Sequence, residues 1–170
     1  YAGDVTRTFP VSGTFSPVQR ELYELVLESQ LAAIDQSKPG NHWNDPHTAA
    51  VRVLTKGLIH LGLLKGTVAS CLRDHSYRQF YMHRTGHWLG MDVHDVGEYK
   101  IHDDWRMLEP GMVLTVEPGL YIEPARGVPK RFHNIGIRIE DDVAITRDGC
   151  EILSRDVPKT VAEIEALMAA

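Results

Sequence analysis

Cysteine is scarce in this sequence, and its scarcity excludes two kinds of stabilising site. The 170 residues contain two cysteines, Cys71 and Cys150, and no Cys-x-x-Cys pair. A disulfide framework needs several cysteines and a thiolate zinc site needs paired ones, so neither is predicted. This cysteine usage fits a reducing, cytoplasmic setting.

Excess basic charge and long apolar runs are lacking too. The chain carries 18 Lys and Arg against 23 Asp and Glu, a formal net charge of -5, and no basic run. It therefore has no electrostatic footprint for nucleic acid. No apolar stretch reaches membrane-spanning length, and no signal segment opens the chain. We expect neither nucleic acid nor a membrane as a partner.

The length and composition favour a single domain. With 170 residues and 43% hydrophobic residues, the chain can bury one core, while two domains would be cramped. Residues 1–9 read as the inside of a strand, with no initiator Met or helix cap before them. We therefore expect the chain to be the carboxyl part of a longer protein.

The order of the predicted elements favours an α+β fold rich in antiparallel strands, with helices early and strands late. Capping residues, Pro and Gly predict helices that start at Ser16, Asp45 and Thr67 and end near Pro39, Gly62 and Arg73, and a short helix from Thr160 to Met168. Alternation predicts strands over residues 1–9, 112–117 and 135–140, with a type II turn at Pro110 and a hairpin turn at 147–149. Residues 123–134 show no strong period and are long enough to rim a pocket.

Three histidines cluster in the segment 81–97, which is otherwise rich in glycine and apolar residues: His83, His87 and His94. A single histidine on such a background usually belongs to the core, but the cluster favours a ligand or catalytic role. Glycines on both sides of His87 let the backbone approach an ion or a substrate closely. Among the other histidines, His42, His47 and His60 have no partner at a recognisable spacing and are interpreted as surface or structural.

Three acidic residues are candidate partners for this cluster. Asp4 lies inside the first predicted strand, Glu117 ends a strand before Pro118, and Glu140 ends the isoleucine-rich strand. Solvated edge strands would explain Asp4 and Glu140 equally well when each is considered alone. Taken with His87, the three carboxylates form an oxygen-rich set that favours Mn²⁺, or a similar divalent ion, over structural zinc. Carboxylates can bridge a pair of ions, so two ions are easier to justify than one.

Four motifs, in this order, resemble those of the metallopeptidase family with the pita-bread fold. They are Gly-Asp4-Val-Thr-Arg-Thr-Phe, His83-x-x-x-His87-Trp-Leu-Gly-x-Asp-Val-His94-Asp-Val-Gly, Glu-Pro-Gly-Met-Val-Leu-Thr-Val-Glu117-Pro-Gly and Gly-Ile-Arg138-Ile-Glu140. Within the family they most resemble the aminopeptidase P branch, the Xaa-Pro aminopeptidases. The match covers essentially the whole chain, so residues 1–170 would be the C-terminal part of a pita-bread catalytic domain, an antiparallel-rich mixed sheet with covering helices.

The resemblance implies an aminopeptidase that uses two divalent metal ions to remove the first residue of peptides with proline in second place. Asp4 and Glu140 would bridge the ions, and His87 and Glu117 would complete one site. A hydroxide bridging the ions would attack the scissile carbonyl. Mn²⁺ is the favoured ion, with Zn²⁺ or Co²⁺ as alternatives.

The resemblance also implies catalytic and substrate-binding roles. Glu117 would transfer the proton, and His94 would hydrogen-bond the developing oxyanion. His83 would line the substrate site, and Arg138 would contact substrate and orient the bridging carboxylate of Glu140.

This sequence departs from the family pattern in three respects. The family has another metal-binding Asp upstream of the position of Tyr1, and an N-terminal domain with the first half of the catalytic fold. We therefore expect this chain alone to be inactive and the intact protein to be active, as a homo-oligomer. Arg84 stands where many relatives have Gly after the first histidine of the motif.

Two alternative functions remain open at this point. A prolidase has the same fold and ligands but acts on Xaa-Pro dipeptides. A non-catalytic peptide-binding protein with this fold would have no need for converging carboxylates, which are costly to bury.

Overall fold

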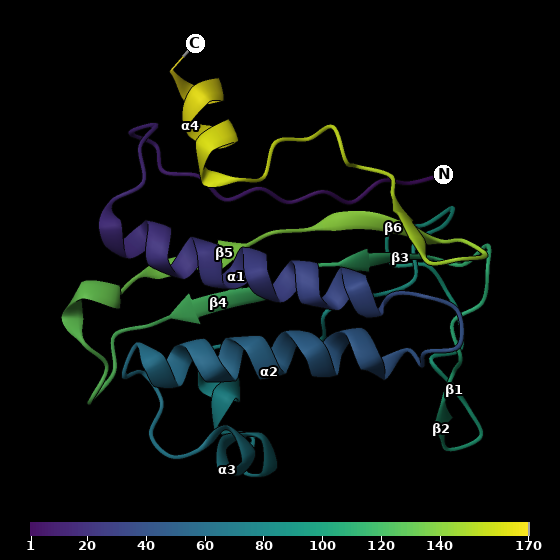
Figure 1. The fold of residues 1–170 in the computed structure, drawn as a ribbon, viewed down its shortest axis with the longest axis horizontal. Helices are drawn as coiled ribbons and strands as arrows, with labels where there is room; N and C mark the ends of the chain where they lie inside the picture. The colour runs from purple at the N-terminus through teal and green to yellow at the C-terminus, as the bar shows by residue number, and fades with distance from the viewer. Residues whose placement is uncertain (170) are drawn as a thin grey trace.

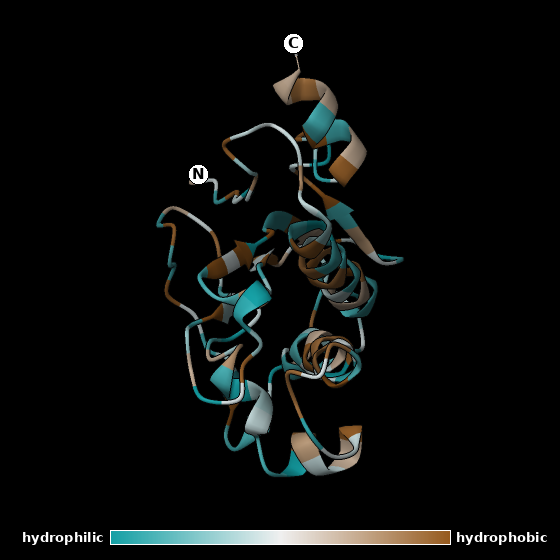
Figure 2. Cartoon of the chain, turned by 90° about the vertical axis from the view of Figure 1, so that its left-hand side faces the viewer, coloured by the Kyte–Doolittle hydropathy of each residue, from teal (hydrophilic) through white to brown (hydrophobic). Residues whose placement is uncertain are grey.

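Two long helices lie side by side and form the largest layer of the computed structural model, which describes residues 1–169 (Figure 1). Helix α1 spans Pro17–Gln36 and α2 spans Asn44–His60. Ser16 and Gln19 form a capping box at the start of α1, as the sequence predicts. Figure 2 views both helices nearly end-on and shows that each carries hydrophobic and hydrophilic residues.

The strands form three small antiparallel sheets beside the helices. Strands β3 (Val113–Val116), β6 (Asp141–Ile145) and β7 (Cys150–Ile152) make one sheet, with β6 in the middle. Strands β4 (Gly119–Ile122) and β5 (Ile135–Arg138) make the second, and β1 (Lys100–Ile101) and β2 (Asp104–Trp105) form a short hairpin. Helix α1 packs on β3, β4 and β5. The predicted antiparallel-rich α+β fold is confirmed.

The remaining elements are short. Helix α3 spans Val68–Arg73, and α4 spans Val161–Met168 with Thr160 as its cap, close to the predicted bounds. The elements η1 (Ser76–Gln79) and η2 (Lys130–Phe132) are short 3-10 helices. No helix within residues 1–169 has both the length and the apolar character to cross a membrane.

Two turn predictions are confirmed. Gly111 follows Pro110 with a φ of 96°, and Met112 N donates to Glu109 O at 3.2 Å, as a type II turn requires. The turn at residues 147–149 joins β6 to β7.

Helix α1 ends at Gln36 and α2 at His60, both within a few residues of the predicted ends.

The prediction of a strand over residues 1–9 is wrong. This segment is extended but belongs to no sheet, and side-chain hydrogen bonds make most of its attachments to the rest of the fold. Asp4 N donates to the carboxylate of Asp142 at 3.1 Å, and Arg138 pairs through both backbone groups with the Thr8 hydroxyl at 2.9 and 3.0 Å. Only scattered backbone bonds, such as Glu140 N to Thr6 O at 3.1 Å, complete the attachment.

Two further expectations need correction. The strand predicted to end at Glu140 ends at Arg138, and β6 begins at Asp141, so Glu140 occupies the junction between two sheets. Residues 123–134 do not line the pocket that holds the predicted site residues, because Val128 and Phe132 turn into the core.

A buried ion cluster around Asp141 fixes the extended segment to the rest of the fold. Arg7 Nη2 and Lys159 Nζ each lie 2.7 Å from a carboxylate oxygen of Asp141, and Gln30 and Ser154 also donate to it. Burial alone would raise the pKa of Asp141, but the bonds from Lys159, Ser154 and Arg7 outweigh it and hold this pKa below its ordinary value. Stability from this group is therefore present at neutral pH and is lost as pH falls through its depressed pKa.

We expect Arg7→Met to reduce the free energy of unfolding by about 3 kcal/mol, since it removes one partner from a buried ion pair. The control is Arg20→Met, which breaks the pair with Glu165, where the side chains are 42% and 26% exposed rather than 10% and 1%. The control should lose less than about 1 kcal/mol. Denaturant unfolding measures both, and equal losses would show that burial of the Asp141 pair adds nothing.

Candidate metal centre

The segment that carries the histidines runs beside β3, and this pairing sets the position of the site. Thr115 N donates to His87 O at 3.0 Å, Glu117 N donates to Thr85 O at 2.7 Å, and Leu89 N donates to Val113 O at 3.1 Å. Between these bonds, Gly86 lies so close to β3 that a Cβ atom there would be 2.0 Å from Thr115 O. His87 and Glu117, 30 positions apart by their numbers, thereby become neighbours.

His87 presents one ring nitrogen to two carboxylates. Its Nδ1 lies 2.9 Å from the carbonyl oxygen of Trp88, which can only accept, so Nδ1 carries the proton. The other nitrogen, Nε2, is the one left to bind a metal, and it lies 3.4 Å from Asp4 Oδ2 and 3.6 Å from Glu117 Oε1. A histidine oriented by a backbone carbonyl in this way is typical of metal ligands.

The four predicted ligands converge at this point. Nitrogen and oxygen atoms of His87, Glu117 and Glu140 lie within 4.8 Å of one another, and so do those of Asp4, His87 and His94. The donor set of carboxylate oxygens and one imidazole nitrogen fits divalent ions of intermediate or hard character. The residues present therefore fit the metal that the sequence implies.

Glu140 shows the electrostatic cost of this convergence. Burial, joined by the neighbouring Glu117 and Asp4 carboxylates, raises its pKa to about 7 despite the hydrogen bond from Thr6, which lowers it. A cation between these carboxylates would stabilise their charged forms. The arrangement thus favours a bound cation.

His94 lies beside His87, with the ring centroids 4.2 Å apart. It comes from the exposed part of the histidine segment, whereas His87 is half-buried against β3. The ring is close enough to Asp4 and His87 to share an ion with them. The structure thus brings His94 to the site.

Tyr121 links His83 to Arg138. His83 Nδ1 lies 2.7 Å from Arg84 O and must donate to it, so His83 Nε2 accepts from the Tyr121 hydroxyl at 2.8 Å. The oxygen of Tyr121 in turn accepts from Arg138 Nε at 2.9 Å. Burial lowers the pKa of His83, which keeps its ring neutral near neutral pH.

Arg138 contacts a different carboxylate from the one predicted. Its Nη1 lies 3.8 Å from Glu117 Oε2, and the hydroxyl of Thr6 rather than Arg138 donates to Glu140. The reason is that the chain leaves β5 after Arg138, so Glu140 does not continue the same strand face.

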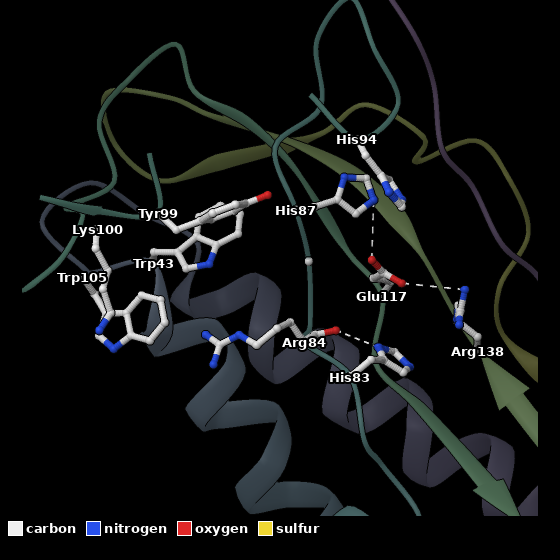
Figure 3. Close-up of a pocket in the computed structure, with 11 residues that line it drawn as sticks. Trp43, His83, Arg84, His87, His94, Tyr99, Lys100, Trp105, Glu117 and Arg138 are labelled. Atoms are coloured by element: carbon white, nitrogen blue, oxygen red, sulfur yellow. Dashed lines mark hydrogen bonds and ion pairs between the residues drawn. The ribbon is translucent and has the colours of Figure 1, made fainter. Parts of the chain in front are cut away.

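His83, His87, His94, Glu117 and Arg138 line a cavity of about 820 Å³. Figure 3 shows that His87, His94, Glu117, His83 and Arg138 lie toward one side of it. Trp43 and Tyr99 form the middle, and Trp105, Lys100 and the guanidinium of Arg84 lie on the opposite side (Figure 3). The cavity is thus much longer than the metal centre alone requires.

Several residues that shape the site give little signal in the sequence. Tyr121, Thr6 and Asp142 act through contacts with residues far away in the chain, at positions that a local pattern does not mark. The aromatic wall of Trp43, Tyr99 and Trp105 is also missed, because these residues come from different segments.

The histidines outside the cluster do not join the metal centre. His42 and His60 are at the surface or near it. His47 is structural, as interpreted from the sequence: its Nδ1 lies 2.8 Å from the hydroxyl of Thr85, which also contacts Tyr81 OH at 2.6 Å. Burial lowers the pKa of His47 to about 3, so its ring stays neutral.

Comparison with known proteins identifies one protein family. Residues 1–147 match metallopeptidase family M24. The chain is 54% identical over 168 residues to an Xaa-Pro aminopeptidase of Haemophilus influenzae, and 41% identical over 198 residues to the human Xaa-Pro dipeptidase.

Solved structures agree with this match. The Pseudomonas aeruginosa aminopeptidase PepP superposes with a TM-score of 0.97 and 62% sequence identity. Zinc-substituted Escherichia coli aminopeptidase P in complex with product gives a TM-score of 0.95 with 52% identity. In both, 99% of this chain is covered but only 38% of the solved chain, so the sequence spans about two fifths of its relatives.

We expect Gly86→Ala to destabilise the protein by about 1 to 3 kcal/mol, since the added methyl group must push β3 away from the histidine segment. Gly149→Ala is the matched control, because a Cβ there meets nothing within 4 Å. The control should change the free energy of unfolding by no more than about 0.5 kcal/mol. Denaturant unfolding compares them, and a Gly86 variant as stable as the control would contradict the close pairing.

Proposed function

The chain belongs to metallopeptidase family M24, and we propose that the full-length protein is a metal-dependent aminopeptidase that removes the N-terminal residue from peptides with proline in second place. The convergence of Asp4, His87, Glu117 and Glu140, with His87 Nε2 facing the carboxylates, is the observation that carries this proposal. The names of the relatives support the choice of substrate.

Four side chains would hold two divalent ions. Asp4 and Glu140 would bridge them, and His87 and Glu117 would complete one site. An Asp upstream of Tyr1 is expected to complete the other. When bound, such ions lower the pKa of a water molecule and polarise a carbonyl oxygen.

The remaining site residues would bind the peptide and move protons. Glu117 is placed to accept a proton, because its carboxylate lies between His87 and Arg138 and is mostly buried. His94 would donate a hydrogen bond to the oxyanion. His83, held neutral and oriented through Tyr121, would line the substrate site together with Arg138.

The wider setting completes the proposal. Residues 1–170 would form the C-terminal part of the catalytic domain. Mn²⁺ is the ion we propose, since three of the four ligands are carboxylates. We further propose a cytoplasmic homo-oligomer, which light scattering and cell fractionation can test.

We expect the full-length protein, loaded with Mn²⁺, to hydrolyse a tripeptide such as Ala-Pro-Ala at least about tenfold faster than the dipeptide Ala-Pro, measured as kcat/KM. Treatment with a chelator should abolish both activities. The control peptide, Ala-Ala-Ala, should be a poor substrate. Faster hydrolysis of the dipeptide would favour a prolidase, and failure to hydrolyse either proline peptide would refute the proposal.

His87→Ala and His94→Ala should separate a ligand from an oxyanion donor. We expect His87→Ala to lose bound metal and nearly all kcat. His94→Ala should keep its metal and lose roughly 100-fold to 1000-fold in kcat. Elemental analysis of the purified full-length variants measures metal content alongside kinetics, and metal loss from His94→Ala would make this residue a ligand.

A further inference from the structure

Two cations share one indole ring at the end of the cavity away from the metal centre. The guanidinium carbon of Arg84 and the Nζ atom of Lys100 each lie 4.7 Å from the centroid of the Trp105 ring. Lys100 and Trp105 are directly opposite each other in the β1–β2 hairpin, so the backbone register sets their contact. Figure 3 shows the Arg84 side chain extending from the histidine segment toward Trp105.

These cations lack a carboxylate partner among residues 1–169. The only side-chain hydrogen bond of Arg84 in that part of the chain goes to the neutral amide oxygen of Asn44, at 2.7 Å. The third cation of the cavity, Arg138, differs because Glu117 lies 3.8 Å from it and Tyr121 accepts from it. The end formed by Arg84, Lys100 and Trp105, here called the cationic end, therefore presents two cations without an ion-pair partner among these residues.

The direction in which a peptide would lie follows from charge and from the reaction. An aminopeptidase has only one substrate residue, with its α-ammonium group, upstream of the scissile bond. Two uncompensated cations would repel that ammonium group. The cationic end must therefore face the part of the peptide that follows the scissile bond.

The geometry points to a subsite at the cationic end for a carboxylate of the peptide downstream of its proline, and we propose that Arg84 and Lys100 determine this preference. The carboxylate would come from an Asp or Glu side chain or from the C-terminus of the peptide. This inference rests on the proposed function and adds a specificity that the metal centre does not supply.

The chemistry of the three side chains suits this ligand. A guanidinium presents paired N–H donors that match the two oxygens of a carboxylate, and an ammonium group adds a point charge. Trp105 holds both cations over its ring face and offers an apolar surface to the adjacent peptide chain. Because Arg84 and Lys100 are exposed, the attraction should weaken as ionic strength rises.

The test uses Mn²⁺-loaded full-length protein and pairs of Ala-Pro peptides that differ only by Glu or Gln at the third, fourth or fifth residue. A second set compares a free C-terminal carboxylate with its carboxamide, which distinguishes the two sources of the charge. We expect at least one Glu peptide or one free acid to exceed its neutral partner by roughly tenfold in kcat/KM, mainly through KM. Raising the salt concentration should reduce that ratio.

Variants assign the effect to the two cations. Arg84→Met and Lys100→Met should each reduce the charged-to-neutral ratio at least about threefold, and the double variant should bring it close to one. Arg52→Met, an exposed cation on α2 away from the cavity, should keep the wild-type ratio. Using a ratio within each variant cancels any general loss of activity, and Lys100→Met gives an independent reading if Arg84→Met folds poorly.

Failure of this inference is distinct from failure of the proposed function. Hydrolysis of Ala-Pro peptides with no charged-to-neutral preference, or with a preference that survives the double variant, overturns the inference alone. If no Ala-Pro peptide is hydrolysed, the proposed function fails. The same pairs are then compared by equilibrium binding, followed by tryptophan fluorescence, and equal affinities for charged and neutral peptides overturn the inference as well.

Discussion

The whole arrangement depends on holding several carboxylates together at the junction of two sheets. The consecutive acidic residues Glu140, Asp141 and Asp142 each contact different residues. Glu140 meets Thr6 in the site, Asp141 meets the Arg7 and Lys159 cations, and Asp142 accepts from Asp4 N. Because Arg7 also donates to the carbonyl oxygens of Thr6 and Glu140, one guanidinium fixes the distance between the segments that carry Asp4 and Glu140.

The same contacts therefore determine both the affinity of the site for metal and the stability of the fold. The Asp141 cluster is fully paired and stabilises the fold at neutral pH. The adjacent Glu140 has a raised pKa, which means that folding places it at some cost among Glu117 and Asp4. A cation bound there would offset that cost, so binding of the ion and folding of the site are coupled.

Local sequence signals predict the parts of this protein that local interactions determine. The capping boxes at Ser16 and Thr160 and the turn at Gly111 are confirmed because each depends on residues only a few positions apart. The motifs also mark the residues that converge, since strand ends and glycines carry chemistry in recognisable patterns. The α+β class follows from the order of these elements.

What the sequence does not predict depends on contacts over long distances along the chain. Residues 1–9 alternate like a strand, yet Asp142 accepts from Asp4 N and the Thr8 hydroxyl bonds both backbone groups of Arg138, so side chains rather than a ladder attach this segment. Arg138 shares an apparent strand period with Glu140, but the chain changes sheets between them, so its ion pair forms with Glu117. The spacing of apolar and polar residues does not reveal where the chain passes from one sheet to another. Nor does it reveal where a side chain, instead of a neighbouring strand, makes the hydrogen bonds.

The two ends of the cavity are built in different ways, and this difference has a chemical basis. The metal centre rests on β3, on a buried ion cluster and on the close approach at Gly86, which together hold reacting groups in fixed positions. The cationic end rests on a hairpin whose strands have two residues each and whose turn contains His102 with a φ of 56°. Its Lys100 and Arg84 side chains are long and exposed, so they can adjust to peptides of different sequence. In the proposed peptidase, catalysis would require the fixed end, whereas recognition of a varied downstream chain would tolerate the adjustable one, so substitutions in the hairpin would alter preference without moving the metal ligands.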